Sequence, residues 1–130
     1  MESQHDPSPA GRILVVEDEQ VVRDVLKFGI RRLGYTPLEA TNVKEAIEHI
    51  KTWQVDLMFL DLQLAGGDGM DLLKLLRRRQ WRVPTVVVSG FISDDIAKEL
   101  VGLGVLGMVS KPFKMERIVE EIQQVMKKDT

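Results

Sequence analysis

The chain has 130 residues, of which 44% are hydrophobic and 29% charged, and its formal net charge is -2 at pH 7. These values are ordinary for one soluble globular domain with its own core, and they give no general reason to expect nucleic acid or an anionic membrane as a partner. Cysteine is absent and only two histidines occur, which excludes disulfides and thiolate chemistry and disfavours a histidine-rich metal site or a Ser-His-Asp hydrolase. No apolar run reaches the roughly 18 residues of a membrane span, and the first residues lack the apolar core of a signal peptide, so the expected location is cytoplasmic.

Short strands and amphipathic helices alternate along the chain. Residues 1–11 contain prolines and small polar residues and are expected to be a disordered leader, with a single domain over 12–130. The expected strands cover residues 13–16, 35–40, 55–60, 85–88 and 106–109. The expected helices follow Glu19, Asn42, Gly69, Ser93 and Lys114, and the last one runs to about Lys127. Such alternation with short connections indicates an α/β fold with a parallel sheet, right-handed crossovers and helices on both faces.

Three local features refine this expectation. Asn42 and Ser93 are the expected N-caps of the second and fourth helices, and the mixed strand at 35–40 is expected near an edge of the sheet. The first helix carries an apolar stripe that would face the core. Its members are Val22, Val25, Leu26, Ile30 and Leu33, with Gly34 as the expected stop.

Polar side chains stand where four of the expected strands end. They are Glu17 and Asp18, then Asp61, Ser89 and Lys111. In an open α/β sheet, ligands bind outside the carboxyl ends of the strands, so these side chains are candidate site residues. Asp61 taken alone could equally be a turn-initiating aspartate before the glycine-rich segment 66–69. The gathering of polar residues at one edge favours a site.

The kinds of residue at this edge point to metal-assisted phosphoryl chemistry. Carboxylates held close together repel, and Mg²⁺ is a hard cation that one or two carboxylates bind together with phosphate oxygens. Asp61 could act as a nucleophile that forms an aspartyl phosphate, while Lys111 neutralises charge and Ser89 donates to a phosphoryl oxygen. The simpler alternative is a salt bridge of Lys111 with Asp18 or Asp61 and no ligand.

A run of three arginines, Arg77-Arg78-Arg79, lies where the third helix is expected to end. Such a run could form a phosphate or nucleic-acid patch, but cations at a helix C-terminus are more often a solvated end favoured by the helix dipole, and we prefer that interpretation. Trp53 and Trp81 both lie in connections and are expected to be packing residues.

Several short motifs together resemble the receiver domain of two-component response regulators. They are V-V-E-D-E, L-D-L followed by G-G-D-G, V-V-V-S-G and S-K-P-F, and the match spans about residues 12–128. The resemblance implies a flavodoxin-like (βα)5 doubly wound sandwich whose five-stranded parallel sheet has the order 2-1-3-4-5. It also implies Mg²⁺-dependent transfer of a phosphoryl group to Asp61 from the phosphohistidine of a sensor histidine kinase or a phosphotransfer protein.

The same resemblance implies a role for each residue of the edge. Asp18, Asp61 and the backbone carbonyl of Gln63 would hold Mg²⁺ directly. Glu17 would assist through a water molecule. Ser89 and Lys111 would contact the phosphoryl group, and the peptide between Lys111 and Pro112 would be cis. A downstream protein or output domain would be contacted through the fourth helix, fifth strand and fifth helix, with no direct contact to nucleic acid or membrane.

The sequence departs from the family pattern at three positions. Ala65 stands where the family often has proline, Met108 where it has a switch aromatic, and Lys114 where it commonly has a small or acidic helix cap. Methionine has no aromatic ring that could move between exposed and buried positions. We therefore expect the loop from Ser89 to Ile92, with the start of the fourth helix, to be the segment that changes conformation on phosphorylation.

Two other classes of protein share part of this pattern. A metal-dependent aspartyl phosphatase would need a second acid two residues after its nucleophile, where this chain has Gln63. A pseudo-receiver, a binding module that is not phosphorylated, would not need to keep all of the edge residues. We therefore expect a phosphoryl acceptor that is not a turnover enzyme on exogenous substrates, either a stand-alone receiver or one taken from a longer regulator.

Overall fold

The main sheet contains five parallel strands in the order β2-β1-β3-β6-β7. A computed structural model describes residues 11–126, so nearly all of the expected leader, and the chain after Met126, lie outside the described residues. The strands are β1 (Arg12–Val16), β2 (Thr36–Ala40), β3 (Leu57–Leu60), β6 (Thr85–Ser89) and β7 (Gly107–Ser110). Counted along the chain, this is the expected order 2-1-3-4-5, and the mixed strand β2 lies at the expected edge.

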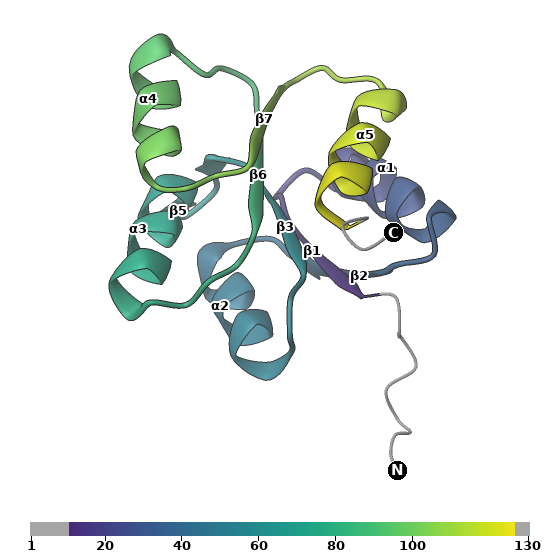
Figure 1. The fold of residues 1–130 in the computed structure, drawn as a ribbon, viewed down its shortest axis with the longest axis horizontal. Helices are drawn as coiled ribbons and strands as arrows, with labels where there is room; N and C mark the ends of the chain where they lie inside the picture. Colours follow the sequence, from purple (N-terminus) through teal and green to yellow (C-terminus); the bar gives the residue numbers. More distant parts are fainter. Residues whose placement is uncertain (1–10, 127–130) are drawn as a thin grey trace.

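In the described part of the chain five helices cover the two faces of this sheet, and Figure 1 shows α1 and α5 on one side and α2, α3 and α4 on the other. The helices are α1 (Gln20–Arg32), α2 (Val43–Thr52), α3 (Gly69–Arg79), α4 (Asp94–Gly102) and α5 (Met115–Met126). The expected caps are confirmed, since the Asn42 and Ser93 side chains accept hydrogen bonds from the backbone N–H groups of Glu45 and Ile96. Within residues 11–126, no helix combines the length and apolar character that crossing a membrane requires.

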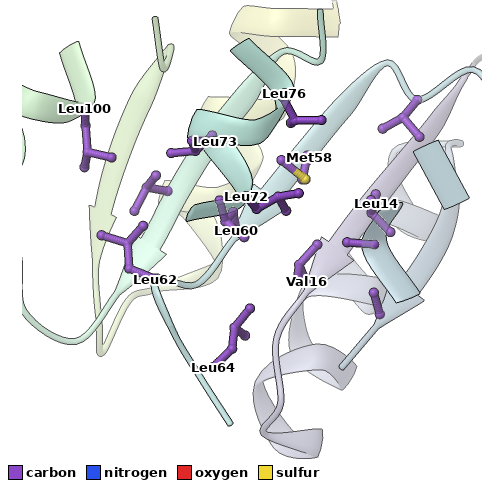
Figure 2. Packing of buried hydrophobic residues seen from close by; sticks show 14 residues of the cluster. Leu14, Val16, Met58, Leu60, Leu62, Leu64, Leu72, Leu73, Leu76 and Leu100 are labelled. Atoms are coloured by element: carbon purple, nitrogen blue, oxygen red, sulfur yellow. The ribbon is translucent and has the colours of Figure 1, made fainter. Parts of the chain in front are cut away.

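The strands at the sheet centre, β1, β3 and β6, are apolar except at their ends, because both of their faces are buried. Successive side chains point to opposite faces, so Ile13 and Val15 pack with α1 and α5, whereas Leu14 and Val16 pack under the other three helices. Figure 2 shows the cluster that Leu14 and Val16 join, in which the labelled leucines of α3 lie close to the side chains of β3, and Leu100 of α4 lies to one side of them. The two hydrophobic clusters, one on each face of the sheet, hold the strands in place and so determine where their ends lie.

The buried face of α1 is narrower than the sequence pattern indicates. Leu26, Gly29 and Ile30 are buried, but Val25 is 36% exposed, so the expectation that Val25 faces the core is wrong. A Cβ on Gly29 would lie 2.7 Å from the sulfur of Met115, which shows how closely α5 approaches α1 there. Val25 lies one turn before Gly29 on the same side of α1, so its exposure indicates that the close contact with α5 does not extend to that turn.

The glycine-rich segment after β3 folds into a small antiparallel hairpin that the sequence pattern did not predict. Its strands are β4 (Gln63–Leu64) and β5 (Gly67–Asp68), and Gly66 between them has a φ of 77°. The Asp68 side chain then caps α3 by accepting a hydrogen bond from the backbone N–H of Met70. The hairpin therefore leads directly from the end of β3 into the start of α3.

Helix α3 ends on Gln80, which has a left-handed conformation with a φ of 59°. The backbone N–H of Trp81 donates to the carbonyl of Leu76 over 3.0 Å, and that of Gln80 donates to Arg77 over 3.1 Å. This pair of bonds is the Schellman motif, in which glycine normally occupies the left-handed position. The left-handed conformation costs a non-glycine residue roughly 1–2 kcal/mol.

We expect Gln80→Gly to raise the free energy of unfolding by about 0.5–1 kcal/mol, because glycine removes that conformational cost while losing some of the gain to chain entropy. Urea unfolding checks this result. Gln124→Gly, at an exposed position inside α5, is the matched control and should lower the free energy of unfolding by about 1 kcal/mol. A loss of stability in Gln80→Gly would contradict the strain argument.

Candidate functional site

Asp61 is held at the carboxyl end of β3 by hydrogen bonds on both sides. Its backbone N–H donates to the carbonyl of Val16 at the end of β1 over 3.0 Å. Its carboxylate oxygen Oδ1 accepts a hydrogen bond of 3.0 Å from the backbone N–H of Gln63, and the residue is only 4% exposed. Asp61 thus begins a turn, as an aspartate at a strand end commonly does, but its second carboxylate oxygen stays available to other groups.

The two acids after β1 lie beside Asp61 and are fixed by different contacts. Glu17 is buried, and its carboxylate oxygen Oε2 accepts a hydrogen bond from the backbone N–H of Glu19 over 3.1 Å. Asp18 is half-buried, and its Oδ2 accepts a hydrogen bond of 2.9 Å from the backbone N–H of Ala65. The Asp18 contact joins the loop after β1 to the hairpin after β3.

Lys111 brings its ammonium group among these acids from the end of β7. Its Nζ lies 2.9 Å from Oδ2 of Asp61, 2.8 Å from Oε1 of Glu17 and 3.4 Å from Oε1 of Glu19. A salt bridge with Asp61 is therefore present, as the simpler alternative requires, but the ammonium is shared with Glu17 rather than with Asp18. The contact with Glu19 was not predicted from the sequence. The run of three acids after β1, Glu17-Asp18-Glu19, was the feature that could have indicated it.

Ser89 completes the set from the end of β6. Its Oγ donates to Oδ1 of Asp61 over 3.4 Å, and its backbone carbonyl accepts a hydrogen bond of 2.9 Å from the N–H of Lys111. The next peptide bond, between Lys111 and Pro112, is cis, as the family resemblance implies. The hydroxyl and the ammonium thus reach different oxygens of the same carboxylate.

Burial and charge act together on the pKa values of this cluster. Burial raises the pKa of the Glu17 carboxyl, which the Lys111 ammonium opposes and the charge of Asp61 reinforces. Burial alone would lower the pKa of the Lys111 ammonium, but its contacts with Glu17 and Asp61 outweigh this effect and raise it above the ordinary value. The ammonium therefore stays charged, whereas the buried Glu17 carboxyl loses its proton less readily than a carboxyl in water.

The arrangement of the acids fits a divalent cation. Glu17, Asp18 and Asp61 each offer an oxygen, and these oxygens lie within 4.8 Å of one another. Counting Glu19, the cluster contains four acids, and the Lys111 ammonium, which contacts three of them, leaves it a formal charge of −3. Oε1 of Glu17 is buried and lies 2.8 Å from the Lys111 ammonium, which it shares with Asp61. Hard cations with oxygen ligands suit such a group of carboxylates.

Gln63 enters this neighbourhood through its backbone, whose N–H donates to Asp61, while its side chain is exposed in β4. Gly69 is a further residue of the site that sequence reasoning missed. A Cβ there would lie 2.5 Å from the carbonyl oxygen of Asp61, so only glycine allows α3 to start this close to the strand end. The glycine-rich segment G-G-D-G was the sequence feature that could have indicated this role, because glycine is favoured where two backbone segments approach closely.

Comparison with known proteins identifies the class that this fold and edge define. The family model of the response regulator receiver domain matches residues 13–123, and the chain therefore belongs to that family. The phosphate regulon transcriptional regulatory protein PhoB of Klebsiella pneumoniae is 31% identical over 121 residues, covering 92% of this chain and 53% of that protein.

Solved structures agree with this assignment. The receiver domain of NtrX from Brucella abortus is 28% identical with a TM-score of 0.81, covering 90% of this chain and 99% of that one. The CheY-like receiver domain protein from Methanospirillum hungatei is 22% identical with a TM-score of 0.83, covering 90% of this chain and 94% of that one, and it bears on the fold alone. The chain spans about half the length of the curated relatives it matches, 53% of PhoB and 47% of the Bacillus cereus sensory transduction protein LytT.

Proposed function

We propose that this receiver domain accepts a phosphoryl group on Asp61 from the phosphohistidine of a sensor histidine kinase or a phosphotransfer protein, in the cytoplasm. The observation that carries this proposal is the shared carboxylate of Asp61, which contacts Lys111 and Ser89 and lies within a cluster of three acids. A buried salt bridge without a ligand would need one acid, whereas this edge holds several for one ammonium.

In the proposed step, one carboxylate oxygen of Asp61 forms the new P–O bond. The P–N bond of the phosphohistidine breaks, and its electron pair returns to the imidazole nitrogen. Lys111 neutralises negative charge on the transferred group, and the Ser89 hydroxyl, now 3.4 Å from Asp61, donates to one of its oxygens. Phosphorylation then adds a charge of about -1.5 to -2 to this edge.

Mg²⁺ is the cation that we propose for the acidic cluster. Asp18, Asp61 and the backbone carbonyl of Gln63 would hold it, with Glu17 assisting through water, and the bound ion would supply positive charge to the phosphoryl oxygens. The close approach of the three carboxylate oxygens and the excess of acids over cations support this choice.

We further propose that the domain is a phosphoryl acceptor and not an enzyme that turns over exogenous esters. A phosphatase that uses an aspartyl nucleophile needs an acid two residues later, and Gln63 stands there. Partner contact would run through α4, β7 and α5, where Phe91, Val101 and Leu106 expose apolar side chains on or beside these elements.

Incubation with acetyl phosphate and Mg²⁺ tests the proposal and separates the three classes. A receiver is expected to give a stable acyl phosphate on Asp61, which intact-mass and peptide mass spectrometry would locate. Continuous release of phosphate in excess of the protein would indicate a phosphatase instead. Absence of both adduct and release, with Mg²⁺ bound, would indicate a pseudo-receiver and overturn the proposal.

Asp18→Ala should weaken Mg²⁺ binding by at least about tenfold and slow phosphorylation in parallel, because the metal loses a charged ligand. The Mg²⁺ affinity can be measured by NMR titration. Asp24→Ala, on the exposed side of α1, removes the same charge away from the cluster and should leave the affinity within about twofold. Equal effects of the two changes would mean that Asp18 acts only through bulk charge and is not a ligand.

A further inference from the structure

A hollow lies at the amino ends of the strands β6 and β7, on the opposite side of the sheet from the strand end that carries Asp61. It has a volume of about 780 Å³ and opens between the ends of α3 and α4, beside the residues that lead into β6 and β7. Its walls are mostly apolar. The apolar side chains that form them include Leu73, Leu76, Trp81, Val83, Leu103 and Val105. All six pack against or belong to the core cluster on this face, so the walls are part of the fold.

The charged residues of this hollow all have the same sign. Arg77 and Arg82 line it, and no acidic residue does. The sequence from 72 to 93 contains five cations and no acid, and Lys74 among them is already paired with Glu99 of α4 over 3.2 Å. The local field at the rim is therefore positive, although the whole chain is slightly negative.

The guanidinium groups of Arg77 and Arg82 differ in their contacts: that of Arg77 has a hydrogen-bond partner, and that of Arg82 has none within the described residues. Arg77 donates to the backbone carbonyl of Gly102, so it bridges α3 to the end of α4 and holds the two sides of the hollow together. The guanidinium of Arg82 makes neither a hydrogen bond nor an ion pair within the described residues. It has five N–H donors and is the group left for a ligand at the rim.

The turn after α3 gives the hollow a defined shape. The left-handed Gln80 reverses the chain, and the backbone hydrogen bond from Trp81 to the Leu76 carbonyl fixes the backbone of Trp81 beside the hollow. The guanidinium of Arg79 lies 5.4 Å from the centre of the same ring. Trp81 and Arg82 thus follow directly on a turn of fixed geometry, and both line the hollow.

We propose that this hollow binds a small organic anion that has an apolar body and a single carboxylate, sulfonate or phosphate group. The apolar body would lie against Trp81 and the core-facing aliphatic side chains, and the anionic group would pair with Arg82. The volume lies within the range of roughly 300–1,000 Å³ that is usual for small-molecule sites, which are mostly apolar with a few placed polar groups. A nucleic-acid strand is disfavoured, because the apolar walls and the unpaired cation lie together in one hollow and not along an open track.

The test uses 8-anilinonaphthalene-1-sulfonate as an anionic probe and the uncharged N-phenyl-1-naphthylamine as its matched analogue. We expect the sulfonate to bind with an increase in fluorescence, and Arg82→Gln to weaken it about tenfold, as loss of a charge-assisted contact implies. Arg78→Gln is the control, because Arg78 is exposed in the same arginine run but does not line the hollow. It should change the affinity by less than about twofold, and binding of the uncharged analogue should not respond to either variant.

NMR locates the probe, since the protein has two tryptophans and only Trp81 lines the hollow. The indole N–H of Trp81 and amides in 80–85 and 103–106 should shift, while the indole of Trp53 serves as the unshifted reference. Shifts spread over other surfaces, or equal weakening by Arg82→Gln and Arg78→Gln, would overturn the proposal. A single-stranded oligonucleotide that displaces the probe and depends equally on both arginines would also overturn it, in favour of a nucleic-acid surface.

Discussion

Asp61→Asn should abolish formation of the acyl phosphate while the domain remains folded. The amide has nearly the shape of the carboxylate, so the contacts to the Gln63 N–H and the Ser89 hydroxyl can persist, but the amide is a far weaker nucleophile. Phosphorylation by acetyl phosphate and Mg²⁺, or by a cognate kinase, is expected to fall below detection. Mass spectrometry measures the adduct, and circular dichroism shows that the fold is retained.

Asp71→Asn is the matched control, since it makes the same chemical change on an exposed residue of α3. It should be phosphorylated like the unaltered protein. Labelling of Asp61→Asn at an undiminished rate would show that another residue accepts the phosphoryl group. In that case the contacts of Lys111 with Asp61 would be structural, and the proposed function would be wrong at its central residue.

The strands could be predicted because a strand that is buried on both faces consists of a continuous run of apolar residues. The run from Ile13 to Val16 has no polar residue, since alternate side chains enter one or the other of two cores. Once the strands are known to be parallel, their carboxyl ends must share an edge. The grouping of Glu17, Asp61 and Lys111 follows from that geometry alone.

Which acid pairs with Lys111 could not be predicted in the same way. The sequence left Asp18 and Asp61 as alternatives, and the structure gives Asp61 together with Glu17. The Asp18 carboxylate is engaged by the backbone N–H of Ala65, a contact that depends on how the hairpin after β3 folds back. No periodicity in the sequence encodes the path of a loop between two strand ends.

The hollow at the end of α3 also could not be predicted from the sequence pattern. The arginine run was interpreted as a solvated helix end, which holds for the exposed Arg78. Arg77 instead crosses to the backbone of α4, and Arg82 lies at the rim of a hollow whose apolar walls come from separate parts of the chain. Such a site depends on the packing of two helices and on the left-handed turn at Gln80, neither of which has a reliable signal in one sequence.

Gly69→Ala is expected to damage both stability and phosphorylation, because the added methyl group has no space. Its Cβ would lie 2.5 Å from the carbonyl oxygen of Asp61 and 2.9 Å from Cα of Leu62, and both of these are backbone atoms that cannot turn aside. The Gly69 N–H also donates to the Leu62 carbonyl over 3.0 Å, so α3 cannot move away without losing that bond. We expect a loss of about 2–3 kcal/mol in the free energy of unfolding, as for overpacked sites.

The same clash should displace the backbone that carries the Asp61 carboxylate from its 2.9 Å contact with Lys111. Because small misplacements of reacting groups are costly, we expect phosphorylation by acetyl phosphate to slow about 10- to 100-fold at temperatures where the variant is still folded. Gly102→Ala in α4 is the control, since a Cβ there meets nothing within 4 Å. It should leave the phosphorylation rate unchanged and raise stability by up to about 1 kcal/mol through helix propensity. If Gly69→Ala behaved like Gly102→Ala, the start of α3 would be free to shift, and its close approach to Asp61 would not be what holds the acceptor carboxylate in place.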